Sequence, residues 1–183
     1  MLFCYYSPFF DAAFNGSFEE GVTQSMDIVD VDPKVFALFL NWLYTQNVAQ
    51  DQDNAQTLGT FINLWLLDDR FLIPKLQNET LVALDWRRME TGKRVGVYHV
   101  VYNNTVRGSP LRRYLAQTTA TGFPSNGAIA YEHDHYPPEL VFDMFEFLRT
   151  QTGPAGARRR VNYSKDELRQ FFVEEGETKP KEN

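Results

Sequence analysis

The 183-residue sequence lacks several features that would point to a particular compartment. It contains a single cysteine, Cys4, so no disulfide can form within the chain, and we expect a cytoplasmic or nuclear location. No run of about 18 uncharged apolar residues occurs. The first residues also lack a basic segment followed by an apolar stretch and a cleavage site. The sequence therefore predicts neither a membrane span nor a secretion signal.

The chain is also poor in basic residues and in phosphate-binding loops. Lys and Arg number 18 against 24 Asp and Glu, which gives a net charge of −6. This balance disfavours non-specific binding to nucleic acids or anionic membranes. The glycine-rich patterns G-x-x-x-x-G-K-[ST] and G-x-G-x-x-G are both absent. We therefore expect no cofactor, no direct nucleic-acid contact and no membrane partner.

Residues suited to catalysis or metal binding are few. His133 and His135 have a metal-like spacing, but a structural zinc site normally needs four ligands, and no further Cys or His cluster is at hand. A nucleophilic Cys4 would need a base and an orienting partner, which its neighbours in sequence do not supply. We expect solvated loop histidines, a core cysteine, no metal and no enzyme. A metal-binding enzyme based on the two histidines is the alternative from another class.

Aromatic side chains and proline-started helices are what the sequence has in plenty. Aromatic residues make up 15% of the chain. Asp32-Pro33 is a cap and first-turn pair, and we predict a helix over residues 33–45. Its predicted face, at helical spacing, is Phe36, Phe39, Leu40, Leu43 and Tyr44. Similar starts at Ser7-Pro8, Pro74, Ser109-Pro110 and Pro137-Pro138 predict further helices.

One segment favours a strand. Residues 26–31 alternate weakly and are rich in β-branched side chains, so we predict a short strand there. The fold class expected from these patterns is α+β: a helix-rich cluster with a small remnant β-sheet, followed by a helical extension.

Composition changes divide the chain into three parts. The break at residues 91–93 (Thr-Gly-Lys) predicts a first domain over residues 1–90 and a helical extension over 94–150. Residues 151–183 read as a flexible tail with an Arg-rich linker at 158–160. Within it, Ser164 and Glu167 form a capping-box pattern, so we expect a short, loosely attached helix.

Four fragments in order resemble the BTB/POZ domain, in particular the fungal single-BTB proteins. They are residues 7–10 (Ser-Pro-Phe-Phe), 14–20 (Phe-Asn-Gly-Ser-Phe-Glu-Glu), 32–36 (Asp-Pro-Lys-Val-Phe) and 42–45 (Trp-Leu-Tyr-Thr). The resemblance implies a BTB/POZ domain over residues 1–90.

The family's domain begins with a β-hairpin and the first half of a long helix, which this chain starts too late to contain. The resemblance therefore predicts an amino-terminally incomplete domain, either from an incomplete gene model or a naturally shortened variant. Because the missing segment helps to form the family's homodimer, the resemblance does not carry the dimer over to this chain.

The resemblance implies a non-enzymatic protein-interaction module, with a substrate adaptor of a cullin-type ubiquitin ligase as the leading function. Phe18 would fill an apolar pocket on the cullin and Glu20 would pair with a base, in a hydrophobic-x-Glu motif. Trp42 and Tyr44, near the end of the 33–45 helix, would broaden the contact. The alternative within the family is a transcriptional co-regulator or an oligomeric scaffold, and a purely structural turn at Phe18 is an equal alternative interpretation of the motif.

Overall fold

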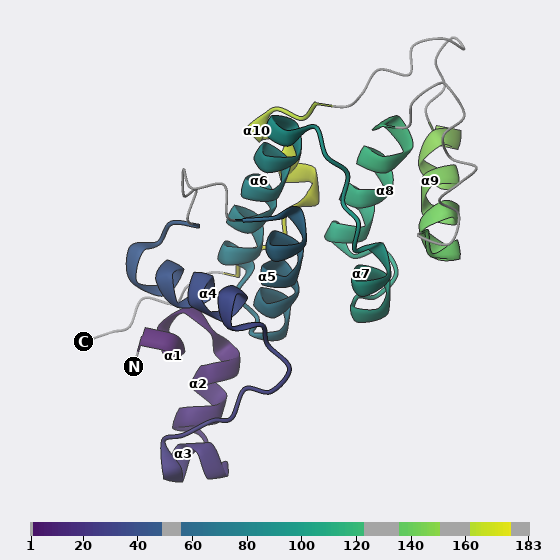
Figure 1. The fold of residues 1–183 in the computed structure, drawn as a ribbon. Helices are drawn as coiled ribbons and strands as arrows, with labels where there is room; N and C mark the ends of the chain where they lie inside the picture. Colours follow the sequence, from purple (N-terminus) through teal and green to yellow (C-terminus); the bar gives the residue numbers. More distant parts are fainter. Residues whose placement is uncertain (1, 49–55, 123–135, 151–161, 177–183) are drawn as a thin grey trace.

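The protein is described by a computed structural model that places residues 2–48, 56–122, 136–150 and 162–176 (Figure 1). His133, His135 and residues 158–160, singled out in the sequence, lie outside these ranges. The helices are α1 (Leu2–Tyr6), α2 (Pro8–Asn15), α3 (Glu19–Thr23), α4 (Pro33–Thr45), α5 (Leu58–Arg70), α6 (Pro74–Thr91), α7 (Tyr98–Asn104), α8 (Pro110–Gly122), α9 (Pro138–Thr150), α10 (Lys165–Leu168) and the 3-10 turn η3 (Arg169–Phe171).

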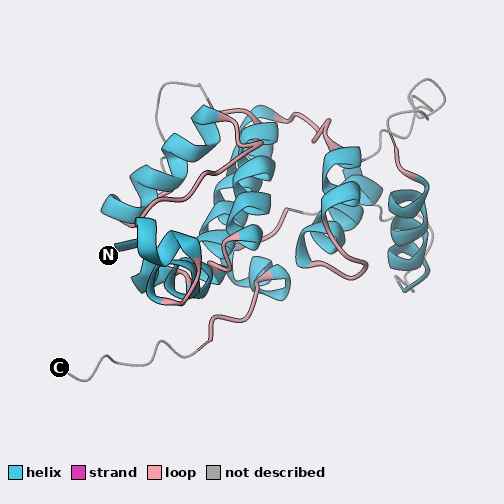
Figure 2. Ribbon diagram, turned by 90° about the horizontal axis from the view of Figure 1, so that it is seen from below, coloured by secondary structure: helices cyan, strands magenta, loops and turns pink. Residues whose placement is uncertain are grey.

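The predicted α+β class is wrong, because the described residues form helices and loops with no strand (Figure 2). Residues 26–31, expected to form a short strand, have no regular secondary structure, and Asp30 within them has a positive φ of 61°. A strand needs a neighbouring strand for its backbone hydrogen bonds, and no described segment supplies one. Met26, Ile28 and Val31 instead pack against the helical core. The weak alternation therefore reflects a loop that lies along the core.

The predicted helix starts are confirmed, and at two of them a side chain caps the first turn. The Phe10 amide donates to Ser7 Oγ at 3.2 Å, and the Lys34 amide donates to Asp32 Oδ1 at 2.8 Å. The predicted 33–45 helix matches α4 at both ends. Helix α8 also begins at Pro110 as expected, but the Ser109 hydroxyl is buried without a hydrogen-bond partner. Proline at the first turn is therefore sufficient for this start.

The buried face of α4 differs from the predicted one. Its buried residues have the same helical spacing but start one position earlier: Val35, Leu38, Phe39, Trp42 and Leu43. Tyr44, predicted on the apolar face, is 79% exposed. Because the helix is apolar on more than one side, spacing alone left its rotation undetermined.

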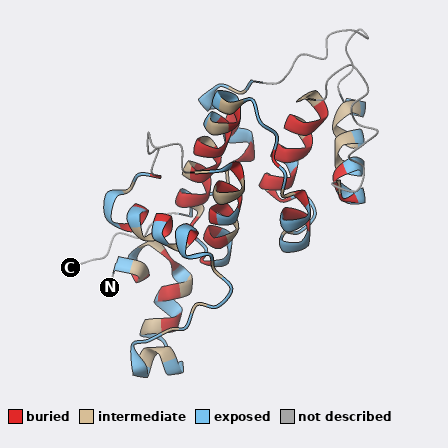
Figure 3. Cartoon of the chain, viewed as in Figure 1, coloured by how far each residue is buried: buried red, intermediate tan, exposed pale blue. Residues whose placement is uncertain are grey.

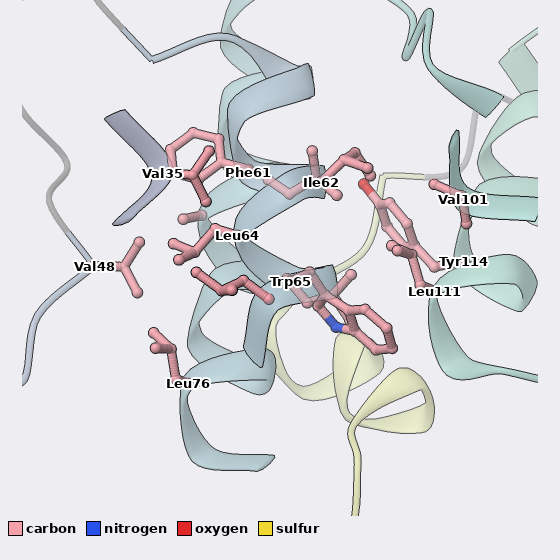
Figure 4. Packing of buried hydrophobic residues seen from close by; sticks show 14 of the residues in the cluster. Val35, Val48, Phe61, Ile62, Leu64, Trp65, Leu76, Val101, Leu111 and Tyr114 are labelled. Atoms are coloured by element: carbon pink, nitrogen blue, oxygen red, sulfur yellow. The ribbon is translucent and has the colours of Figure 1, made fainter. Parts of the chain in front are cut away.

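The core is continuous from α2 to η3, with α5 and α6 at its centre (Figure 3). Figure 4 shows Ile62 and Trp65 of α5 directed toward Val101 of α7 and toward Leu111 and Tyr114 of α8. Apolar burial is the main favourable term in folding, so this shared core stabilises both sides of the break at Gly92. There α6 ends in a left-handed C-cap, with φ 63°.

Two carboxyl-terminal predictions need correction. The 164–172 segment, expected to be loosely attached, places Leu168 and Phe171 in the core. The helical spacing of Val141, Met144, Phe145 and Leu148 predicts an apolar face on α9, but Val141 and Phe145 are exposed and Leu140 is the buried residue of this helix. No helix in the part of the chain that the structure places is long and apolar enough to cross a membrane.

Candidate partner-binding surface

The corner between α2 and α3 presents the predicted Phe18 motif. A Cβ at Gly16 would lie 2.2 Å from the carbonyl oxygen of Ala12, and one at Gly21 would lie 2.6 Å from that of Gly16. Only glycine permits such close backbone approach. The side-chain Nε2 of Gln24 then donates to the carbonyl oxygens of Phe14 and Gly21, at 3.2 and 2.8 Å. These contacts fold α3 tightly against the end of α2.

Phe18 is the N-cap residue of α3, and its side chain is 61% exposed. Val22, one helical turn later, is 84% exposed, and α3 contains no buried residue. Residues four apart lie on the same face of a helix. Phe18 and Val22 therefore form a small apolar surface that the rest of the described chain does not cover.

Two carboxylates lie next to Phe18 in the chain. Glu19 and Glu20 occupy the first turn of α3, where Glu20 is half-buried. Residues 2–48 contain a single basic residue, Lys34. Their acidic residues are Asp11, Glu19, Glu20, Asp27, Asp30 and Asp32. A complementary partner should therefore be basic around an apolar pocket.

Trp42, a predicted partner-binding residue, lies inside the core with 0% of its surface exposed. Its indole Nε1 donates to Glu79 Oε2 at 2.7 Å, and the Tyr6 ring packs edge-on at 5.1 Å between centroids. Lys75 Nζ lies 5.9 Å from the indole ring centroid. Trp42 thus positions α4 on α6 and cannot itself contact a partner in this conformation.

Tyr44 is accessible, but on another part of the surface. It lies in the last turn of α4, whereas Phe18 caps α3. Figure 1 shows α3 at the far end of α2, well away from the carboxyl end of α4. The structure therefore brings Phe18 and Glu20 together and leaves Tyr44 apart from them.

Asp85, Arg88 and Tyr114 form the most polar cluster in the interior. Asp85 Oδ1 accepts hydrogen bonds from Arg88 Nη2 at 2.7 Å and from Tyr114 Oη at 2.8 Å. Burial, followed by the charge of Asp85, raises the pKa of Tyr114 well above its ordinary value, so its hydroxyl stays protonated. The cluster is sealed from solvent, and it serves to join α6 to α8.

Cys4 is buried, as the core interpretation predicts, and its thiol lies 3.6 Å from the carbonyl oxygen of Phe10. Among the residues placed by the structure, no group of three or more His, Cys, Asp or Glu side chains could hold a metal ion.

Two exposed residues of this part of the chain, Val22 and Tyr5, were not predicted from the sequence. Val22 follows Phe18 at i+4, and this spacing was the available signal. Tyr5 stacks edge-on against Tyr6, at 4.8 Å between centroids, and is largely exposed on α1. Its place in an otherwise apolar helix gave no indication of exposure.

Comparison with known proteins supports the predicted domain. Over 67 residues the chain is 31% identical to Kelch-like protein 40 of Xenopus tropicalis and 30% identical to Kelch-like protein 40 of Xenopus laevis. The alignments cover 37% of this chain and 11% of each relative, so the chain spans a small part of the curated proteins it matches. No solved structure matches the chain significantly. Residues 1–85 match the sequence profile of the BTB/POZ domain, and this part of the chain is a BTB/POZ domain, a protein-interaction module.

Proposed function

We propose that this BTB/POZ protein is a non-enzymatic adaptor that binds a cullin-type ubiquitin ligase scaffold through the α2–α3 corner. The observation that most directly supports this proposal is the exposed apolar pair Phe18 and Val22 beside the carboxylate of Glu20. Phe18 enters an apolar pocket on the cullin, and Glu20 pairs with a basic residue at its edge. Phe18–Glu20 resembles the hydrophobic-x-Glu motif by which some BTB adaptors contact a cullin.

The contact has to be larger than the motif itself. Standard interfaces bury about 800 Å² on each partner, and one exposed aromatic side chain supplies a fraction of that area. Tyr44 and Trp42, the other predicted contact residues, lie on α4 away from α3, with Trp42 buried. We therefore assign the centre of the contact to Phe18, Val22 and Glu20, with Tyr44 outside this centre.

Several further expectations from the sequence are included in this proposal. They are a division at residues 91–93 into a domain and a helical extension, grouping with fungal single-BTB proteins, a cytoplasmic or nuclear location, and a transcriptional co-regulator or oligomeric scaffold as the alternative function.

Affinity purification from the native cell tests the adaptor function. The tagged chain should recover a cullin, and Phe18→Ala or Glu20→Ala should abolish recovery, because each removes a central contact. Tyr44→Ala is the matched control, since it removes an exposed aromatic side chain from a different part of the surface. A parent chain that recovers no cullin would contradict the proposal, as would equal losses with all three substitutions.

A further inference from the structure

Residues 162–176, here called the strap, lie against α6 and α8 (Figure 1). The strap contains α10 and η3 and then continues as an extended segment. Within it only Leu168 and Phe171 are buried. These two side chains, three residues apart on one turn of helix, belong to the buried core. The surface of α6 and α8 that the strap covers, which includes Asn78, Tyr114 and Gln117, is here called the groove.

Aromatic contacts define the floor of this groove. The Phe171 ring meets the Tyr114 ring edge-on, with 5.6 Å between centroids and 81° between planes. Tyr163 of the strap packs edge-on against Phe171 at 5.2 Å and lies 6.4 Å from Tyr114 between centroids, and its hydroxyl donates to Gln117 Oε1 at 2.8 Å. The strap thus covers the Asp85–Arg88–Tyr114 cluster.

After η3, one side chain of the groove binds the strap's backbone. The Val173 amide donates to Asn78 Oδ1 at 2.7 Å, and Asn78 Nδ2 donates to the Val173 carbonyl oxygen at 2.9 Å. Asn78 Nδ2 also lies 3.0 Å from Glu175 Oε1. A side-chain amide that pairs with both backbone groups of one residue recognises an extended peptide whatever its side chain there.

The strap also has the local order of a preformed ligand. Ser164 Oγ accepts from the Glu167 amide at 3.2 Å, and Glu167 Oε2 accepts from the Ser164 amide at 2.8 Å. These reciprocal hydrogen bonds start the helical turn without help from the groove. A pre-ordered turn loses less conformational entropy when it binds.

We propose that the groove between α6 and α8 is a peptide-binding site that the strap occupies in cis. Its ligand is a capped helical turn with Leu and Phe three residues apart, followed by an extended residue whose backbone pairs with Asn78. A partner that carries this pattern displaces the strap. Because the strap is tethered, its high effective concentration keeps the site closed to weak competitors.

A labelled synthetic peptide of residues 162–176 tests the proposal on the full-length chain. The variant Leu168→Ser/Phe171→Ser releases its own strap, so it should bind the peptide at least about tenfold more tightly than the parent chain does. Adding Asn78→Ala to this variant should weaken peptide binding by about tenfold, since the three hydrogen bonds of Asn78 to the strap are lost. The matched control is Lys165→Ser/Gln170→Ser, which changes two exposed strap residues and should leave the site closed.

Three outcomes would overturn the proposal. In the first, the Leu168→Ser/Phe171→Ser variant keeps its helical circular dichroism but does not bind the peptide. In the second, that variant loses its helical signal, which would make the strap an integral part of the fold. In the third, the parent chain is a dimer that the same two substitutions convert to a monomer, which would place a second copy's strap in the groove.

Discussion

At the scale of single residues, Asp68 is a buried carboxyl group with half of its hydrogen-bonding capacity unused. Thr80 Oγ1 donates to Asp68 Oδ2 at 3.1 Å, while Oδ1 has no partner. Burial raises the pKa of Asp68 well above its ordinary value; the Thr80 hydrogen bond lowers it, and the charges of Asp69 and Glu79 raise it further. Asp68 is therefore held in its protonated form well above the pH at which an unfolded chain releases the proton.

This raised pKa makes the fold less stable as pH increases. Below the unfolded-state pKa of about 3.9, both states bind the proton and the contribution of Asp68 is fully present. Between that pH and the raised folded-state pKa, the native state binds more protons than the unfolded state, so stability falls as pH rises. Each unit of pKa difference corresponds to about 1.4 kcal/mol.

The substitution Asp68→Asn should remove this component of the pH dependence. The measurement is urea unfolding at intervals from pH 4 upward, comparing the slope of unfolding free energy against pH. Asp27→Asn, at an exposed loop position, is the control and should keep the parent slope. An Asp68→Asn curve parallel to the parent curve would contradict this assignment.

At the scale of elements, the α2–α3 corner depends on backbone contacts that a methyl group would break. A Cβ at Gly16 would lie 2.2 Å from the Ala12 carbonyl oxygen, a rigid backbone atom. Overpacking of this kind typically costs about 1–3 kcal/mol. Because α3 has no buried residue, it is free to shift away and relieve the contact.

Gly16→Ala should therefore release α3 from α2 while the core stays folded. Hydrogen exchange should accelerate at the α3 amides and remain unchanged in α5 and α6. Gly96→Ala is the matched control, because a Cβ there meets nothing within 4 Å. Unchanged exchange in α3 would show that the corner tolerates a side chain at residue 16.

Sequence patterns predicted the positions of the helices better than they predicted which face of a helix is buried. Asp32-Pro33 fixed the start of α4 because cap and proline act through local backbone geometry. The predicted buried face of α4 was displaced by one residue. Trp42 and Tyr44 are both large and aromatic, and tertiary packing decides which of them is buried. The prediction of a strand at residues 26–31 was wrong, because a strand forms only where another strand, elsewhere in the chain, pairs with it.

Only the feature of the candidate site that depends on neighbouring residues in the sequence, the exposure of Phe18, could be predicted. Phe18 follows a glycine corner outside a helix, and it is exposed as expected. The attachment of the strap was not predictable, because Asn78 and Val173 are 95 residues apart and an asparagine in a helix gives no signal of its partner.

At the scale of the whole molecule, the Asp85–Arg88–Tyr114 cluster joins α6, which the BTB/POZ match reaches through residue 85, to α8 beyond it. Burial alone lowers the pKa of Arg88, but Tyr114 and Asp85 outweigh it and raise the pKa. Both the shared core and this charge pair predict that the two helices unfold together.

Arg88→Leu should lower the unfolding free energy by about 3–5 kcal/mol, because it leaves the buried Asp85 carboxylate without its counter-charge. The measurement is urea unfolding followed by circular dichroism and tryptophan fluorescence, with coincident transitions expected. Arg149→Leu is the control: its pair with Glu146, 3.1 Å apart, is exposed and should contribute about 1 kcal/mol or less. Equal effects of the two substitutions would contradict the assigned role of the cluster.

If the proposed adaptor function is right, the whole molecule is one partner of a two-protein complex, and calorimetric titration with a purified cullin measures that contact directly. The account predicts saturable one-to-one binding that Phe18→Ala weakens by about 30-fold, the effect of a hot-spot residue worth about 2 kcal/mol. Tyr44→Ala should leave the affinity unchanged. Absence of binding by the folded parent chain, or full affinity in Phe18→Ala, would contradict the account.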